Sequence, residues 1–303
     1  MKPEEIDHSA LRDADVLIVR TRTKVNEVLL RDTKVQQVCT ATIGFDHIDT
    51  AYCDTHGIQW SACPGCNAQA VCDYIEEAIE EIQNSKFKIQ NSSPTIGVVG
   101  VGHVGSLVAK MAERKGMKVL LNDPPKQIGI SLDGIAKNCD IITFHVPLVE
   151  IQNSQFKIHN SQFKIQNYPT RHLCDEAFLS RCKPDALIIN ASRGGVVNEE
   201  ALLRSGRPYI LDTWENEPHL CPEVLQNALL ASMHIAGYSV EGKRTATQMC
   251  LDAVAARWGL PPVKVEAPQP TGDSARGWLR RVSEQLKAHP EAFEQLRQNY
   301  PLR

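Results

Sequence analysis

Short runs of β-branched and aliphatic residues recur along the chain, and stretches with helical spacing separate several of them. The runs that we predict to be buried strands are residues 16–19, 35–39, 95–99, 118–121, 141–145, 186–190 and 209–212. Helical patterns occur at residues 106–115 and 199–204. Strands that alternate with helices are typical of a parallel sheet covered by helices. The pattern therefore predicts an α/β protein with a doubly wound parallel sheet.

A seven-residue motif interrupts this pattern three times, as NSKFKIQ at 84–90, NSQFKIH at 153–159 and NSQFKIQ at 160–166. Its Phe and Ile stand two residues apart, which does not fit a coiled coil and suits a short strand or an extended loop. Three copies in two places are too few for a solenoid. We predict that the copies are insertions in surface connections, where added length costs little stability.

The composition is that of a globular protein, with 42% hydrophobic and 23% charged residues in a chain of 303. The net charge of −3 argues against a general nucleic-acid binder. No apolar run approaches the roughly 18 residues that a membrane span needs. The opening MKPEEIDHSA lacks the basic and apolar regions of a signal peptide. We expect a cytosolic protein that has no nucleic-acid or membrane partner.

The ten cysteines are scattered along the chain, and one CxxC occurs at Cys63 and Cys66. A redox pair or half of a zinc site is an alternative, but no second CxxC or His pair stands at ligand spacing. Free cysteine often serves as a small buried apolar residue. We therefore expect buried thiols and no metal site.

The strongest local motif is TIGVVGVGHVG at residues 95–105, in which an apolar strand leads into Gly100, Gly102 and Gly105 and a helix follows. The first glycine allows a tight turn, the second lets a pyrophosphate approach the backbone, and the third permits close packing of helix on strand. The helix N-terminus attracts the phosphates. The next strand ends at Asp123, whose carboxylate can accept hydrogen bonds from the ribose of NAD. A turn before two prolines is the alternative role for Asp123, but it does not explain the spacing from the glycines.

Three polar side chains stand at or near the ends of later predicted strands, where an open α/β sheet places its ligands. They are Arg193 in INASRGG, Glu217 in DTWENEP and His234 in SMHIAGY. A guanidinium binds carboxylate oxygens in pairs, and an imidazole accepts the proton that a hydroxyl loses on oxidation. A carboxylate on the second ring nitrogen orients that imidazole. Each residue alone suits a structural role, whereas together they predict oxidation of a hydroxy acid.

The three residues resemble the Arg–Glu–His set of the D-isomer-specific 2-hydroxyacid dehydrogenase family. Further similar motifs lie between residues 19 and 243: VRTRTKVNEVLL, TATIGFDHID, PGCNAQAV, NDPP, TFHVPL, DTWENEP and HIAGYSVEGK. In that family the Arg binds the substrate carboxylate and carbonyl, the His transfers the proton, and the Glu supports the His. The motifs are most similar to the branch that oxidises the 2-hydroxyl of 4-phospho-D-erythronate during pyridoxine 5'-phosphate biosynthesis. The resemblance implies NAD, a phosphorylated hydroxy acid as substrate, and a homodimer.

The resemblance also implies further contacts. Substrate would contact Thr21, Thr42 and Tyr238. NAD would contact Gly100, Gly102, His103, Val104, Gly105, Asp123, Val146, Ala191, Ser192, Asp212 and Gly237. Val146 departs from the pattern, because close relatives often have Thr there. Arg20, Arg22 and Lys24 are candidates for the substrate phosphate, and a solvated surface strip is the alternative.

By the same resemblance, residues 94–240 form a Rossmann-type NAD-binding domain with an insertion at 150–168. A smaller flavodoxin-like substrate domain takes residues 1–83 and 241–259. Residues 260–303 are a shortened dimerisation region, and their change in composition with a polar helix at 275–288 predicts a separate appendage. Family members usually begin with a further strand and helix, which by this resemblance we expect to be missing here; losing the strand would leave an exposed sheet edge and a smaller core. We therefore expect intact chemistry but weakened stability or domain closure.

Two alternatives stay open. Another D-2-hydroxyacid dehydrogenase, acting on glycerate, phosphoglycerate or lactate, would share the Arg–Glu–His set. A non-catalytic NAD-binding protein or remnant would keep the fold without turnover, although a pure sensor needs no proton-transfer pair.

Overall fold

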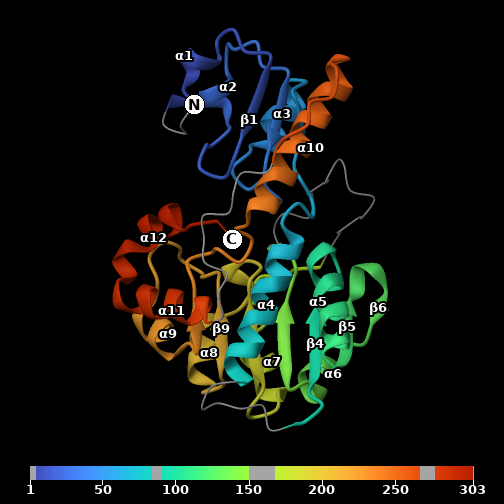
Figure 1. Cartoon of the computed structure of the whole chain (residues 1–303), viewed down its shortest axis with the longest axis vertical. Helices are drawn as coiled ribbons and strands as arrows, with labels where there is room; N and C mark the ends of the chain where they lie inside the picture. The colour runs from blue at the N-terminus through green and yellow to red at the C-terminus, as the bar shows by residue number, and fades with distance from the viewer. Residues whose placement is uncertain (1–4, 84–90, 150–167, 267–276, 303) are drawn as a thin grey trace. The chain divides into compact units, whose positions relative to one another are not determined.

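The computed structural model describes residues 5–83, 91–149, 168–266 and 277–302. The chain divides into two compact units (Figure 1). Unit 1 consists of Met1–Asn67 and Ser239–Pro270, and unit 2 consists of Ala68–Tyr238 and Thr271–Arg303. All three copies of the seven-residue motif, which we predicted to be insertions, lie outside the described residues.

Unit 1 contains a three-stranded parallel sheet. Its strands, in sheet order, are β1 (Val16–Val19), β2 (Gln37–Thr40) and β3 (Gln59–Ser61). Its helices are α1 (His8–Leu11), α2 (Glu27–Leu30), α3 (Thr50–Thr55) and α10 (Val240–Trp258). The three short helices each follow an Asp or Asn whose side chain accepts a hydrogen bond from a first-turn amide. The long helix α10 packs against β2, so the last part of this unit covers its first part.

Unit 2 contains, among the described residues, a seven-stranded sheet that is parallel except for the pairing of β6 with β5. In sheet order its strands are β10 (Leu230–Ala231), β9 (Tyr209–Leu211), β8 (Leu187–Asn190), β7 (Ile141–Phe144), β4 (Thr95–Val99), β5 (Lys118–Asp123) and β6 (Ile128–Gly129). The chain places β5 and β6 on one side of β4, and every later strand on the other side. This reversal is the doubly wound Rossmann order, in which ligands bind at the carboxyl ends of the strands.

Helices flank this sheet in two groups (Figure 1). They are α4 (Ala68–Gln83), α5 (His103–Arg114), α6 (Leu132–Asn138), α7 (Glu176–Arg181), α8 (Glu199–Arg204), α9 (Pro222–Asn227), α11 (Trp278–Ala288) and α12 (Phe293–Asn299). Short 3-10 helices span Pro124–Lys126, Gly194–Val196 and Pro290–Ala292. In one group α4 packs against α5 and α11, while α6, α7, α8 and α9 pack in succession in the other. None of the helices that the structure describes is long and apolar enough to cross a membrane.

The unit boundaries differ from the predicted domain boundaries in two places. The prediction assigns α4 to the substrate domain, but Tyr74 and Ile79 of α4 are buried in the core of unit 2. It also makes the C-terminal region a separate appendage, but Trp278, Leu286 and Phe293 belong to that same core. The Trp278 and Tyr74 rings lie 6.0 Å apart. Amphipathic helices bury their apolar face wherever apolar surface is available, and for α4 and α11 that surface is in unit 2.

The chain forms no disulfide, since all ten cysteines are free thiols. Cys63 is 2% exposed, and its Sγ lies 3.6 Å from that of Cys250 on α10. No group of three or more His, Cys, Asp or Glu residues within the described part of the chain is arranged to hold a metal ion.

Candidate active site

The predicted functional residues of unit 2 follow the carboxyl ends of its parallel strands. The glycine loop follows β4, and Asp123 ends β5. Arg193 follows β8, Glu217 follows β9, and His234 follows β10. Because parallel strands end at one edge of the sheet, residues far apart in the sequence meet at that edge.

In the glycine loop, Gly100 and Gly105 are packed too tightly for a side chain, whereas Gly102 leaves open space. Gly100 has φ +90°, and a β-carbon there would lie 2.7 Å from the His145 carbonyl oxygen. A β-carbon on Gly105 would lie 1.9 Å from the Gly100 carbonyl oxygen. At Gly102, by contrast, a β-carbon would meet nothing within 4 Å. Gly102 also caps α5 without a side-chain hydrogen bond, so the first helical amides are available to a phosphate.

Asp123 lies beside this loop. Its Oδ2 accepts a hydrogen bond from the Val101 amide at 2.9 Å, and the Lys126 Nζ lies 3.7 Å from the same oxygen. Val146 also lies close to this loop, since a β-carbon on Gly100 would come within 2.8 Å of the Val146 Cγ1. The open loop and the adjacent acid fit the pyrophosphate and ribose of a dinucleotide.

The remaining residues predicted to contact NAD lie at the same edge of unit 2. His103 and Val104 begin α5, Ala191 and Ser192 lie in the turn after β8, and Gly237 follows the segment that carries His234. His103 is exposed, and the other four are partly exposed. Their contact with NAD stays a prediction.

The turn that carries Arg193 is organised by Asn190, which is fully buried. The Asn190 Oδ1 accepts hydrogen bonds from the Ser192 amide (3.1 Å) and hydroxyl (2.8 Å). Its Nδ2 donates to the Arg193 carbonyl oxygen at 2.8 Å. A β-carbon on Gly194 would lie 1.9 Å from the Trp214 carbonyl oxygen. The Arg193 turn therefore packs directly on the loop that carries Glu217.

His234 and Glu217 form a hydrogen-bonded pair, with 2.8 Å between Nδ1 and Oε2. The second Glu217 oxygen accepts from the Trp214 amide at 2.9 Å. Burial acts to raise the pKa of Glu217, but the hydrogen bond and charge of His234, the Trp214 amide and the charge of Arg297 together outweigh it, so this pKa lies below its usual value. An ionised carboxylate only accepts hydrogen bonds, so the neutral form of the His234 imidazole carries its proton on Nδ1 and has a lone pair on Nε2. The pair can therefore act as a general base.

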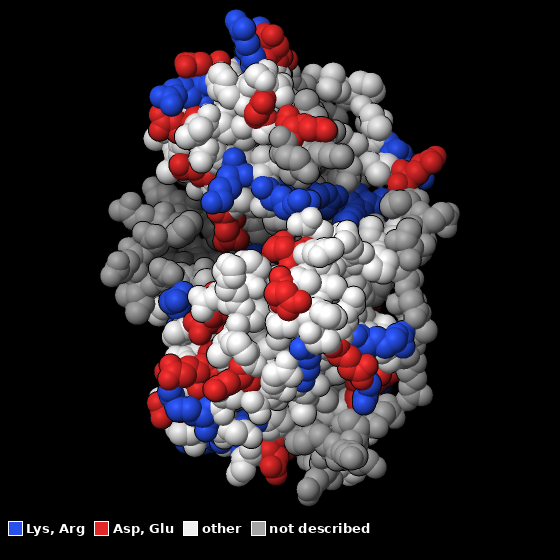
Figure 2. All heavy atoms as spheres, turned by 90° about the vertical axis from the view of Figure 1, so that its left-hand side faces the viewer, with Lys and Arg blue, Asp and Glu red and all other residues white. Residues whose placement is uncertain are grey.

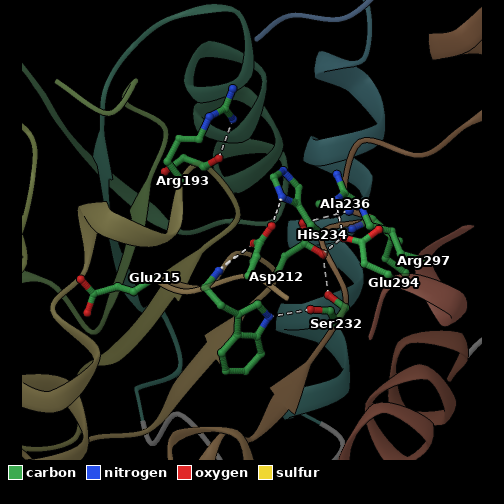
Figure 3. Close-up of polar contacts among 12 residues, drawn as sticks. Arg193, Asp212, Glu215, Ser232, His234, Ala236, Glu294 and Arg297 are labelled. Atoms are coloured by element: carbon green, nitrogen blue, oxygen red, sulfur yellow. Dashed lines mark hydrogen bonds and ion pairs between the residues drawn. The ribbon is translucent and has the colours of Figure 1, made fainter. Parts of the chain in front are cut away.

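Asp212, which we predicted to contact NAD, is 1% exposed. Its carboxylate accepts hydrogen bonds from the Ser232 hydroxyl (2.6 Å) and from the amides of Ile235 (2.8 Å) and Ala236 (3.0 Å). The His234 amide donates to the Asp212 carbonyl oxygen at 2.8 Å. Figure 3 shows these contacts around His234. In the structure Asp212 fixes the segment that positions the imidazole, while its NAD contact stays a prediction.

The three predicted substrate residues belong to different units. Tyr238 ends the His234 segment of unit 2, and its amide donates to the Ile235 carbonyl oxygen at 2.8 Å. Thr21 and Thr42 belong to unit 1, where they follow the carboxyl ends of β1 and β2. Thr21 is exposed, and the Thr42 hydroxyl donates to the Gly44 carbonyl oxygen at 2.8 Å.

A second His–Glu pair was missed by the sequence analysis. The His172 Nε2 lies 2.5 Å from the Glu215 Oε1, and its Nδ1 lies 3.4 Å from the Asn198 Nδ2. The Glu215 amide donates to the Glu199 carboxylate at 2.7 Å, and burial raises the pKa of Glu199 to about 7. In Figure 3 the Glu215 carboxylate points away from His234. Glu215 stands two residues from Glu217 in the same motif, which was the available sequence signal.

Arg297 of α12 was also missed, since it lies far along the chain in a segment that we predicted to be separate. Its Nη1 lies 3.4 Å from the Glu294 Oε1, and its side chain hydrogen-bonds with Tyr238. Its charge also acts to lower the pKa of Glu217. Figure 3 shows Arg297 beside Ala236 and Glu294. The C-terminal helix therefore brings a cation to the His234–Glu217 pair.

Comparison with known proteins agrees with this arrangement. The family model of the D-isomer-specific 2-hydroxyacid dehydrogenase NAD-binding domain matches residues 70–236. An erythronate-4-phosphate dehydrogenase from Bacteroides fragilis is 43% identical over 97% of this chain and 86% of its own length. A protein of the same name from Bacteroides thetaiotaomicron is 40% identical over 99% of this chain and 88% of its own length.

The fold is also found among solved structures. The holo form of D-mandelate dehydrogenase from Rhodotorula graminis superposes with a TM-score of 0.68 at 20% identity, over 86% of this chain and 88% of that chain. This likeness supports the predicted Rossmann-type α/β architecture. The matches over nearly the whole chain show that it belongs to the D-isomer-specific 2-hydroxyacid dehydrogenase family and is an NAD-dependent dehydrogenase.

Proposed function

We propose that this chain oxidises the 2-hydroxyl of 4-phospho-D-erythronate with NAD and produces 2-oxo-3-hydroxy-4-phosphobutanoate, a step of pyridoxine 5'-phosphate biosynthesis. The observation that carries the chemistry is the 2.8 Å contact between the His234 Nδ1 and the Glu217 Oε2. The relatives named erythronate-4-phosphate dehydrogenase support the choice of substrate.

Arg193 binds the substrate carboxylate in this proposal. Its planar guanidinium matches two carboxylate oxygens at once, which fixes the orientation of the adjacent C2 carbon. Asn190 restrains the Arg193 backbone through a hydrogen bond to its carbonyl oxygen at 2.8 Å. A fixed backbone lowers the entropy that the side chain loses on binding.

His234 accepts the proton. As the C2–H bond breaks, the O–H bond gives its proton to the Nε2 lone pair and the C2–O bond becomes a carbonyl. NAD, when bound at the glycine loop, supplies the acceptor for the hydride. Glu217 keeps the Nδ1–H in place and stabilises the imidazolium that forms, while Asp212 holds the His234 backbone.

A panel of acids with NAD tests the proposal, with NADH followed by its absorbance. We expect the highest kcat/KM for 4-phospho-D-erythronate, above D-erythronate, D-glycerate, 3-phosphoglycerate and D-lactate. If kcat/KM is higher for glycerate, phosphoglycerate or lactate, that acid is the substrate and the proposed substrate is wrong. Binding of NAD without NADH formation from any acid would favour a non-catalytic NAD-binding protein.

We further propose that the protein acts in the cytosol as a homodimer, as the family resemblance implies. Light scattering coupled to gel filtration tests the dimer. A monomer mass with full activity contradicts it.

A further inference from the structure

Asp212 lies at the centre of a hydrogen-bonded group inside unit 2. Figure 2 shows Asp and Glu side chains at the surface of the face that it presents, whereas Asp212 is 1% exposed. Burying a carboxylate is unfavourable unless donors satisfy its oxygens. Its Oδ1 accepts from the Ser232 hydroxyl at 2.6 Å and from the Ile235 amide at 2.8 Å, and its Oδ2 accepts from the Ala236 amide at 3.0 Å. Ser232 is the side-chain donor among these three.

Ser232 connects this carboxylate to Tyr74 of α4. A serine hydroxyl has a single proton, and that of Ser232 goes to Asp212. The Tyr74 hydroxyl, which lies 2.8 Å from the Ser232 Oγ, therefore donates to that oxygen. Tyr74 and Ser232 are both fully buried. The three side chains thus form a relay of hydrogen bonds that runs from Tyr74 through Ser232 to Asp212, in which each hydroxyl orients the next group.

The backbone of Ser232 is held as well as its side chain. Its carbonyl oxygen accepts a hydrogen bond from the Trp214 indole at 2.9 Å. The Trp214 amide in turn donates to the Glu217 carboxylate at 2.9 Å. Through the indole contact Ser232 holds the loop of Glu217, and through Asp212 it holds the segment of His234 (Figure 3). Ser232 therefore connects the two partners of the His234–Glu217 pair.

The backbone of His234 depends on such support. Its φ of +57° lies in the left-handed region, which residues other than glycine rarely adopt. A conformation of this kind persists only where surrounding contacts hold it. Asp212 supplies these contacts, since its carboxylate binds the amides of the two residues after His234 and its carbonyl oxygen accepts from the His234 amide. A carboxylate that turns loses these amides, and the imidazole then moves relative to Glu217.

We propose that Tyr74 and Ser232 are positioning residues for the oxidation, because their hydroxyls fix the carboxylate that holds the His234 segment. Both are fully buried, so they act through Asp212 and not on the substrate. The role of His234 as the base rests on the proposed function. The contact between His234 and Glu217 can be measured without turnover, so the positioning and the proposed function are tested separately.

The tautomer of His234 tests the positioning without substrate. Glu217 holds the proton of the neutral imidazole on Nδ1, so the contact can be followed through the ring ¹⁵N shifts of protein with labelled histidine, at a pH where the imidazole is neutral. In Tyr74→Phe and Ser232→Ala we expect the Nδ1 and Nε2 shifts to move towards each other, because a ring that is held less firmly against the carboxylate also takes its proton on Nε2. His234→Ala assigns the signals. Wild-type shifts in both variants overturn the proposal.

Tyr209→Phe is the matched control. Tyr209 is another buried tyrosine of unit 2, 2% exposed, and its hydroxyl donates to the Val224 carbonyl oxygen on α9 at 2.7 Å. This variant also loses a buried hydroxyl and its hydrogen bond, so its free energy of unfolding falls while the relay stays intact. We expect it to keep the wild-type ring shifts and kcat. Equal effects of Tyr74→Phe and Tyr209→Phe assign Tyr74 a structural role and overturn the proposal.

Kinetics with 4-phospho-D-erythronate and NAD then connect the relay to turnover. We expect kcat to fall about 10-fold in Tyr74→Phe and about 30-fold or more in Ser232→Ala, with KM for the acid changed less than about 3-fold, since a small displacement of a catalytic group slows the reaction. Because the two hydroxyls act in series, kcat of the double variant should match that of Ser232→Ala within about 2-fold. Losses that multiply in the double variant overturn the relay. If wild-type protein oxidises no acid, the proposed function fails, while the ring shifts still decide the positioning.

Discussion

The two His–Glu pairs of unit 2 use the same chemical groups in opposite ways. Both carboxylates come from the DTWENEP segment, and both histidines have positive φ values, 57° at His234 and 51° at His172. His234 presents Nδ1 to Glu217, whereas His172 presents Nε2 to Glu215. His172 also contacts Asn198 through its other nitrogen. Among the residues that the structure describes, the His234 imidazole has a nitrogen left for substrate, whereas the His172 imidazole has both nitrogens engaged.

The difference shows that a His–carboxylate contact does not by itself identify a base. The His172 pair connects the segment before α7 to the loops that carry Arg193 and Glu217, since the His172 amide also donates to the Gly195 carbonyl oxygen at 2.7 Å. A pair whose donors and acceptors are all satisfied stabilises a loop arrangement. The atom that remains available, Nε2 of His234, decides which pair can move a proton.

The largest expected effect is that of His234→Ala, which removes the general base. We expect kcat to fall about 10³- to 10⁴-fold, the range for loss of general base catalysis. His172→Ala is the matched variant, and we expect its kcat to fall less than about 10-fold while its free energy of unfolding drops by roughly 1–3 kcal/mol. Steady-state kinetics and urea unfolding of both variants measure the contrast. Similar losses of kcat in the two would remove the distinction between the pairs.

A smaller effect is expected for Glu217→Gln, which keeps a hydrogen-bond acceptor but removes the charge. We expect kcat/KM to fall about 10- to 100-fold, because the imidazolium loses its anionic partner in the transition state. The acid limb of the kcat/KM profile should move to lower pH for the same reason. In Glu215→Gln the limb should stay where it is in the wild type. An acid limb that moves equally in both variants speaks against a specific role for Glu217.

The smallest effect concerns Glu199, which supports the second pair. Its pKa of about 7 lies above the unfolded value of roughly 4.3, so the folded chain binds this proton more tightly than the unfolded chain. That contribution is fully present below the unfolded value and is lost as the pH rises through about 7. Between about pH 5 and about pH 8 the wild type should therefore lose roughly 1–3 kcal/mol of unfolding free energy that Glu199→Gln retains.

Urea unfolding at the two pH values measures this difference. Glu200→Gln is the control, because Glu200 neighbours Glu199 on α8 but is exposed and pairs with Arg204. We expect Glu200→Gln to follow the wild-type pH dependence. A Glu199→Gln variant with the wild-type slope would mean that Glu199 titrates alike in both states.

Local sequence patterns were sufficient for most of the fold. The predicted strand at 95–99 and the predicted helix at 199–204 match β4 and α8. The glycine loop and Asp123 were predicted from spacing, because strand, turn and helix follow one another directly. The strands β3, β6 and β10 were missed, since each has only two or three residues and none forms a recognisable apolar run of strand length.

Site residues could be predicted from the sequence only where they stand in a recognisable motif. Arg193, Glu217 and His234 each stand in a recognisable motif after a strand. Arg297 does not, because its place beside Tyr238 depends on how α11 and α12 pack on unit 2. The contact between His172 and Glu215 likewise joins segments that are distant along the chain, so it cannot be predicted from local residue spacing.

The discontinuity of the two units has a consequence for synthesis on the ribosome. Unit 1 closes only when α10 is available, and the core of unit 2 lacks Trp278 and Phe293 until nearly the whole chain has been translated. Neither unit is therefore a contiguous stretch that can be completed early while the other is being made. The apolar surface that α10, α11 and α12 cover therefore stays exposed, or is bound by chaperones, until these helices have been made.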